Sequence, residues 1–89
     1  MLSMEELLKA VEEDNDEDAM FEIGCKYKYG WDIEKNYEEA VYYLSLAAEL
    51  GNKSAQFELG GLYELGLGVP KDMDKARELY AMSKEEDEN

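Results

Sequence analysis

Small and aromatic residues recur at helical spacing along most of the chain, and short glycine-rich or acidic stretches separate these segments. The clearest example is the segment 55–80, in which two amphipathic runs flank the sequence Gly66-Leu67-Gly68-Val69-Pro70. Because glycine and proline interrupt helical periodicity, this pattern predicts two helices joined by a tight corner. We expect the first at 53–65 and the second from 72 to about 84, with the aspartate at 72 as its N-cap.

The same pattern occurs 36 residues earlier in the chain. We therefore expect a first pair of helices at 17–29 and 37–50, joined by a corner at 30–35. A fixed period of this size, with small and aromatic residues in phase, is typical of a stacked helical solenoid. Identical residues at this offset are Ala19 and Ala55, Phe21 and Phe57, Glu22 and Glu58, Gly24 and Gly60, Tyr27 and Tyr63, Gly30 and Gly66, Lys35 and Lys71, and Ala40 and Ala76.

The first 15 residues predict one further helix that caps the array. Ser3 and Glu6 have the spacing of a capping box, and Leu7 and Val11 fall on one apolar face. At the 36-residue offset this helix matches the second helix of a repeat. The predicted fold is all-α, with about five helices in a single domain: a capping helix at 1–15, a first repeat at 16–51, a second repeat at 52–84 and an acidic tail at 85–89.

Four positions carry expectations about the backbone. Gly24 and Gly60 fall inside predicted helices, where glycine is unfavourable by roughly 1 kcal/mol relative to alanine, so each is expected to allow a close approach of a neighbouring helix. Asn15 stands where a helix must end in a left-handed conformation, which asparagine tolerates. Asp32 replaces Gly68 in the first corner, and aspartate accepts left-handed conformations better than most residues.

The chain has 89 residues, no histidine and one cysteine. This inventory excludes a zinc cage, a histidine-based catalytic triad and an internal disulfide. The N-terminus carries acidic residues and no long apolar run, so we expect neither a signal peptide nor a membrane span. We expect a cytoplasmic location, no cofactor and no enzymatic activity, since nothing singles out one pair of carboxylates for catalysis.

The net charge is −14, and most of it lies at the two ends of the chain. The simpler interpretation is that the terminal units of a repeat array need polar outer faces for solubility. The alternative is that the acidic ends dock a basic partner. The acidic residues that would face this partner are Glu12, Glu13, Asp14, Asp16, Glu17 and Asp18.

Part of this acidic cluster has a local structural role. Asp16 is the expected N-cap of the next helix, and the acids at 17 and 18 lie at the positive end of that helix dipole. The alternating spacing of Asp14, Asp16 and Asp18 is similar to a calcium loop, but Ala19 and Cys25 stand where such a loop needs glycine and glutamate. We therefore expect no metal site.

The second copy contains A-x-F-x-L-G-x-x-Y-x-x-G-x-G-V-x-x-D-x-x-x-A, and the first copy ends in A-A-E-L-G-N-x-x-A. Together these motifs resemble the Sel1-like repeat, a relative of the tetratricopeptide repeat, over about residues 19–84. The resemblance implies a right-handed α-solenoid of antiparallel helix pairs that binds proteins or peptides, and it implies no active site. The paired cysteines of disulfide-linked secreted members are absent here.

By analogy with related repeats, the first helix of each pair would line a concave binding face. The partner-binding candidates on this face and in the first corner are Phe21, Cys25, Lys28, Tyr29, Trp31, Phe57, Glu64 and Leu65. Phe21 and Phe57 recur in phase, so we favour packing between repeats for most of their surface. Tyr29 and Trp31 either anchor an interface or, as we favour, form an apolar plug that closes the corner.

Two further features bear on exposed surface. A lone thiol such as Cys25 is more often a small hydrophobe than a nucleophile. The last helix has no successor to cover it, which leaves part of Leu79, Tyr80 or Met82 available. Such a surface is either tolerated, covered by the tail or used for self-association. We expect a monomer or a weak homodimer.

Two classes of function remain. The first, which we favour, is a non-enzymatic adaptor or scaffold whose short helical groove binds a protein or peptide, with the acidic residues steering a basic partner. The second is a small acidic inhibitor that blocks a nucleic-acid-binding protein by electrostatic mimicry. Direct nucleic-acid binding is opposed by the charge, because 9 basic residues are outnumbered by 23 acidic ones and form no stripe. No contact with a membrane is expected.

Overall fold

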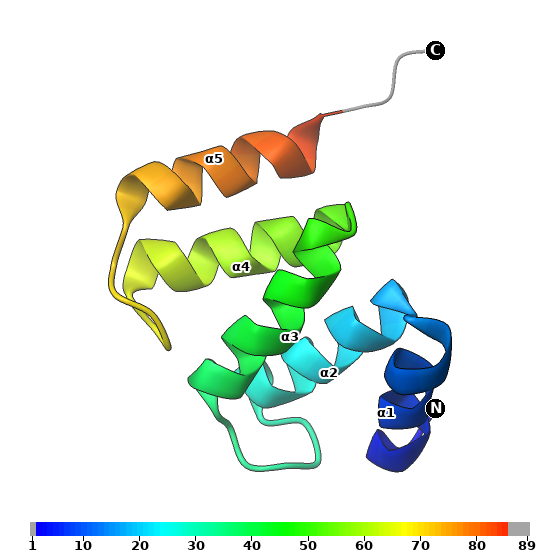
Figure 1. The fold of residues 1–89 in the computed structure, drawn as a ribbon. Helices are drawn as coiled ribbons and strands as arrows, with labels where there is room; N and C mark the ends of the chain where they lie inside the picture. The colour runs from blue at the N-terminus through cyan, green and yellow to red at the C-terminus, as the bar shows by residue number, and fades with distance from the viewer. Residues whose placement is uncertain (1, 86–89) are drawn as a thin grey trace.

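The computed structural model describes residues 2–85, and every regular element within them is a helix. The helices are α1 (Met4–Asp14), α2 (Glu17–Tyr29), α3 (Tyr37–Glu49), α4 (Lys53–Leu65) and α5 (Met73–Lys84) (Figure 1). The all-α prediction is confirmed, although α3 ends at Glu49 and leaves Leu50 as its C-cap. Residues 86–89 of the predicted acidic tail lie outside the described residues.

The helices form successive antiparallel pairs (Figure 1). Helix α2 packs against α3 and α4 packs against α5, while the contact between α3 and α4 joins the two pairs and α1 packs on α2. Each helix therefore contacts mainly its neighbours in sequence, which is the defining property of a solenoid. The predicted stack of helix pairs is confirmed.

Side chains at the N-caps fix where the helices begin. The Ser3 hydroxyl accepts a bond from the Glu6 amide at 3.2 Å and the Glu6 carboxylate accepts one from the Ser3 amide at 2.9 Å, which completes the predicted capping box. The pKa of Glu6 is lowered, mainly by the hydrogen bond with the Ser3 backbone and to a smaller extent by that with the Ser3 side chain. Asp16 and Asp72 cap α2 and α5 as expected, and Asn15 ends α1 in the left-handed region at φ 52°.

Two glycines let the paired helices approach closely. A Cβ atom on Gly24 of α2 would lie 2.6 Å from Cγ of Leu44 on α3, and one on Gly60 of α4 would lie 2.9 Å from the ring of Tyr80 on α5. Both distances are too short for a real Cβ atom, so only glycine fits without a shift of the neighbouring helix. The predicted role of both glycines in helix packing is confirmed.

The core follows the stack from α1 to α5. Leu79 of α5 belongs to it, with 4% of its surface exposed, so the expectation that part of Leu79, Tyr80 or Met82 is available holds for Met82 and not for Leu79. Tyr80 is half-buried and Met82 is exposed. The largest fully buried side chains come from four successive helices and are Leu7, Ile23, Leu44 and Leu62.

The two corners have the same left-handed backbone at equivalent positions. Asp32 has φ 65° in the first corner and Gly68 has φ 79° in the second, so the prediction that aspartate substitutes for glycine here is confirmed. Gly68 has an additional constraint, because a Cβ atom on it would lie 2.5 Å from the carbonyl oxygen of Tyr37. The second corner therefore packs directly on the start of α3.

Candidate partner-binding surface

Three large aromatic side chains are about half exposed on or beside the first helices of the two repeats. The exposed fractions are 45% for Tyr29 at the end of α2, 51% for Trp31 in the corner that follows, and 54% for Phe57 on α4. Burying aromatic surface of this kind against a partner is strongly favourable. We call the surface formed by these three residues the aromatic surface.

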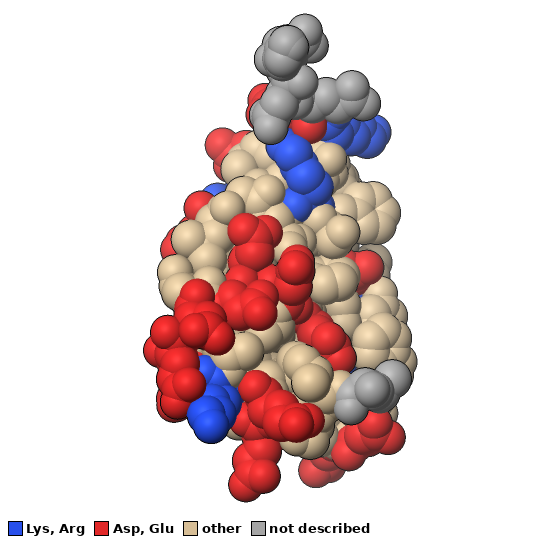
Figure 2. Space-filling model, turned by 90° about the vertical axis from the view of Figure 1, so that its right-hand side faces the viewer, with Lys and Arg blue, Asp and Glu red and all other residues tan. Residues whose placement is uncertain are grey.

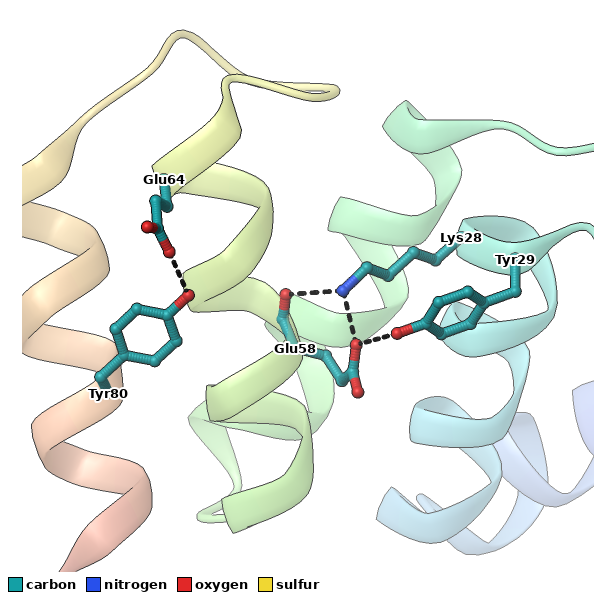
Figure 3. A network of polar contacts seen from close by, with 5 residues as sticks. All are labelled: Lys28, Tyr29, Glu58, Glu64 and Tyr80. Carbon is teal, nitrogen blue, oxygen red and sulfur yellow. Dashed lines mark hydrogen bonds and ion pairs between the residues drawn. The ribbon is translucent and has the colours of Figure 1, made fainter.

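Glu58 holds the two repeats together beside this surface (Figure 3). Its Oε1 atom accepts from the Lys28 Nζ atom at 2.5 Å and from the Tyr29 hydroxyl at 2.7 Å, and the Lys28 amine also reaches the Glu58 carbonyl oxygen at 3.4 Å. Burial on its own lowers the pKa of Lys28, but the hydrogen bond and charge of Glu58 outweigh it and the net pKa is raised. Lys28 is therefore charged at neutral pH and bound to Glu58.

A second polar contact lies between α4 and α5 (Figure 3). The Tyr80 hydroxyl donates to Oε1 of Glu64 at 2.6 Å, and the Tyr80 ring lies 5.4 Å from that of Phe57. The bond to Glu64, together with burial, raises the pKa of Tyr80 to about 12. Glu64, a predicted partner-binding residue, is thus engaged within the protein.

Tyr29 and Trp31 form a stacked pair, with ring centroids 5.1 Å apart and planes inclined by 19°. Their exposure contradicts the favoured interpretation of an apolar plug. The matching residue of Trp31 in the second corner, Leu67, is half-buried and packs on the core, but Leu65, which matches Tyr29, is 67% exposed. The plug interpretation therefore holds only for Leu67.

Phe21 and Phe57 also differ from each other, although they are equivalent in the repeat. Phe21 is half-buried against the core, whereas more than half of Phe57 is exposed. The prediction that packing covers most of both rings is confirmed for Phe21 and wrong for Phe57. The two rings line a hollow between α2, α4 and the end of α5, together with Lys53, Ser54, Glu58, Ser83 and Lys84.

Cys25 does not lie on the exposed face predicted for it. It is 4% exposed within the core, and burial, reinforced by the charge of Glu58, raises the pKa of its thiol to about 12. Cys25 belongs to the core cluster that extends from α2 to α5, so its placement among the accessible partner-binding residues is wrong. Its alternative interpretation as a small buried hydrophobe is confirmed.

Acidic side chains gather on the face that includes α1 and the start of α2 (Figure 2). Of the predicted acidic residues, Asp16 and Glu17 are half-buried at the start of α2. The remaining ones are exposed, and three of them occupy the last turn of α1, which contains no basic residue. These exposed residues are Glu12, Glu13, Asp14 and Asp18.

Glu58 is the residue that sequence reasoning missed. Its identity with Glu22 at the repeat offset was the available signal, but that match did not indicate which of the two glutamates would accept hydrogen bonds from the neighbouring repeat.

Within residues 2–85 no group of three potential metal-ligating side chains comes together, and no helix there combines the length and apolar character needed to cross a membrane.

Comparison with known proteins identifies the repeat. The Sel1 repeat model matches residues 17–52 and again residues 53–87. A Sel1 repeat protein from Oxalobacter formigenes has a similar solved structure, with a TM-score of 0.79 and 36% identity over 90% of this chain and 32% of that one. No curated protein matches this chain.

A protective antigen present in uropathogenic Escherichia coli strains, which displays the SLR fold, is also similar, with a TM-score of 0.86 and 28% identity over 90% of this chain and 17% of that one. The chain thus spans about a third or less of these two proteins. Sel1 repeats generally mediate protein–protein interactions and typically form non-catalytic scaffolds. With two consecutive copies of the repeat, the chain belongs to the Sel1 repeat family.

Proposed function

We propose that this chain is an interaction module that binds a protein or peptide across α2 and α4, on the aromatic surface. The observation that carries the proposal is the exposure of Tyr29, Trp31 and Phe57, each close to one half. Aromatic residues dominate the binding energy of many interfaces because they bury large areas with few rotatable bonds. Three of them on successive repeats give a partner several anchors.

The polar network supports this proposal because it fixes the geometry of the surface. Glu58 on α4 accepts bonds from both Lys28 and Tyr29 on α2. Tyr29 in turn stacks on Trp31. A surface ordered before binding loses less conformational entropy when a partner docks.

The negative charge of the chain supports the proposal that the partner is basic. The chain carries a net charge of −14, and exposed acids lie at the end of α1 and the start of α2. Acidic side chains around a contact accelerate the association of a basic protein and disfavour acidic competitors. We infer that the aromatic surface supplies the binding energy and that the acidic face selects the charge of the partner.

Site-specific photo-crosslinking tests the proposal. A photoreactive phenylalanine analogue is placed at Trp31, at Phe57 or at Tyr42, an aromatic residue on α3 that is 57% exposed and serves as the matched control. After irradiation in the native cell, we expect one and the same protein to be linked at positions 31 and 57 and not at 42. Equal labelling at position 42, or different proteins at 31 and 57, would contradict a defined contact on this surface.

A second candidate function is the acidic inhibitor that blocks a nucleic-acid-binding protein. The observation that favours it is the position of Glu12, Glu13 and Asp14 in the last turn of α1, without a basic residue in that turn. Acids there are disfavoured by the helix dipole, so their presence has no local structural explanation. Capture of a nucleic-acid-binding protein that is lost in Glu12→Gln/Glu13→Gln/Asp14→Asn and at high salt, and kept in Trp31→Ala, would favour this function.

A further inference from the structure

We infer that the hollow beside Trp31 binds an arginine side chain of the partner. This inference rests on the proposed function and deepens it, because it assigns the chemistry that one part of the aromatic surface recognises. The hollow has a volume of about 530 Å³ and is lined by Glu22, Lys26, Trp31 and Asp32. It therefore combines an aromatic wall with two carboxylates.

The indole of Trp31 offers an open face. Tyr29 covers one side of the ring, at a centroid distance of 5.1 Å, and 51% of the residue is still exposed. The exposed part borders the hollow. Tryptophan is the aromatic side chain with the strongest attraction for a cation placed over its face.

The charges around the hollow favour a cation. The Lys26 side chain is only 6% exposed and its amine pairs with the Asp32 carboxylate at 3.8 Å, so one of the two carboxylates of the hollow matches its one cation. Glu22 has no ion pair or hydrogen bond from its side chain among residues 2–85. The hollow thus retains one uncompensated carboxylate beside the indole face, while Asp32 extends into solvent with 81% of its side chain exposed.

Arginine fits this arrangement better than lysine does. A guanidinium group is planar, so it can stack on the indole while its edge donates two parallel bonds to a carboxylate such as that of Glu22. Lysine offers a compact, strongly hydrated charge that gains less from a flat ring. The end of α2, next to this corner, already contains one internal cation–π contact, because Lys28 Nζ lies 5.2 Å from the centroid of the Tyr29 ring.

The fluorescence of Trp31 gives a direct test, because it is the only tryptophan in the chain. The full chain is titrated at about 0.15 M salt with a capped glycine-rich hexapeptide that contains one arginine. The controls are the same peptide with citrulline, which is neutral and has the same shape, and with lysine. We expect the arginine peptide to change the fluorescence in a saturable way and the lysine peptide to bind with an affinity lower by about threefold or more. The citrulline peptide should not reach saturation.

Two charge variants locate the contact. Glu22→Gln removes the uncompensated carboxylate and is expected to weaken arginine binding by about threefold or more. Glu49→Gln removes the same charge from an exposed site at the end of α3 and is expected to leave the affinity unchanged within error. Equal affinities for arginine and citrulline, or equal losses in the two variants, would overturn the inference.

The outcomes separate this inference from the proposed function. If position 31 crosslinks to the partner but the arginine peptide does not saturate, the aromatic surface is the contact and the arginine assignment is wrong. If the arginine peptide saturates and Glu22→Gln lowers its affinity, but no protein crosslinks at position 31 or 57, the hollow binds arginine and the proposed adaptor function fails. When both results are positive, replacement of single arginines by lysine in the captured partner identifies the side chain that occupies the hollow.

Discussion

The two corners of this protein share a backbone and differ in what surrounds them. In the second corner, Gly68 lies against the start of α3 and Leu67 packs on the core. In the first corner, the equivalent residues are Asp32, whose side chain is 81% exposed, and Trp31, which is 51% exposed. One corner is therefore part of the packing between repeats, and the other is open to solvent.

This difference shows where a repeat protein can vary. A position that faces the preceding repeat must satisfy steric limits, so glycine is required where a Cβ atom would approach a carbonyl oxygen to 2.5 Å. A position that faces solvent must satisfy only the backbone conformation, which aspartate can also adopt. The open corner is consequently free to carry a large aromatic and a charge, which are features of a binding surface.

The largest expected effect is that of Gly68→Ala. A side chain at this position would meet the Tyr37 carbonyl at 2.5 Å and would occupy a backbone with φ 79°. We expect the free energy of unfolding to fall by about 2 to 4 kcal/mol, from left-handed strain and overpacking together. Urea denaturation followed by circular dichroism measures the change.

A matched variant separates the two causes. Gly51 has φ 93°, and a Cβ atom added there would have no atom within 4 Å. We therefore expect Gly51→Ala to lower the free energy of unfolding only by the backbone strain, roughly 1 to 2 kcal/mol. If the two variants lose the same free energy of unfolding, the contact with α3 does not stabilise the second corner. The two corners would then not differ in their packing.

A second pair of variants compares the equivalent glutamates. Glu58→Gln weakens charge-assisted bonds from Lys28 and Tyr29 at a site where the Glu58 side chain is 20% exposed, so we expect a loss of about 1 to 2 kcal/mol. Glu22→Gln should change the free energy of unfolding by less than about 0.5 kcal/mol. Equal losses would mean that the ion pair does not hold the repeats together.

Local signals in the sequence predicted much of this fold. The spacing of Ser3 and Glu6 identified the capping box, the offset of Gly24 and Gly60 identified the close helix contacts, and Asp32 was correctly expected in a left-handed conformation. Each of these features depends on residues close in sequence or on exact repetition. Periodicity is sufficient to detect both.

The exposure of the candidate site was predicted less well, because exposure depends on which neighbouring helices each copy of the repeat meets. Phe21 and Phe57 are identical in register, yet only Phe21 is mostly covered. Cys25 was placed on the accessible face and is buried. The binding role of Glu58 was likewise invisible, since its partners come from the neighbouring repeat. An offset shows which residues are equivalent but does not show which neighbours each copy meets.

Variants of the apolar corner residues sharpen the same comparison. Leu67→Ala removes a side chain that packs on the core, and we expect a loss of about 1 to 2 kcal/mol with unchanged crosslinking at position 57. Trp31→Ala removes a half-exposed ring, so we expect a loss below about 1 kcal/mol together with loss of partner capture. Reversal of this pattern would assign the structural role to the first corner instead.

The last expected effect appears only at alkaline pH and concerns α5, where Tyr80 occupies the position that Leu44 has in the first repeat. Its pKa of about 12 lies above the ordinary value of 10 because the neutral phenol donates to Glu64. The unfolded phenol therefore ionises first as pH rises, and the stabilisation present below pH 10 is lost between about pH 10 and 12. The pKa of Lys28 is also raised, because the hydrogen bond and charge of Glu58 outweigh burial, so its contribution to stability is likewise lost as the pH rises.

Chemical denaturation at several pH values tests this contribution. The free energy of unfolding of the wild type should fall with pH above 10, and the fall should be shallower in Tyr80→Phe, which has no ionisable hydroxyl. Glu64→Gln keeps a neutral acceptor for the same bond, so it should flatten the profile partly rather than fully. If all three profiles are parallel, the Tyr80–Glu64 bond does not distinguish the folded from the unfolded state, and the last helix is held by Leu79 and the other core contacts that the two repeats share.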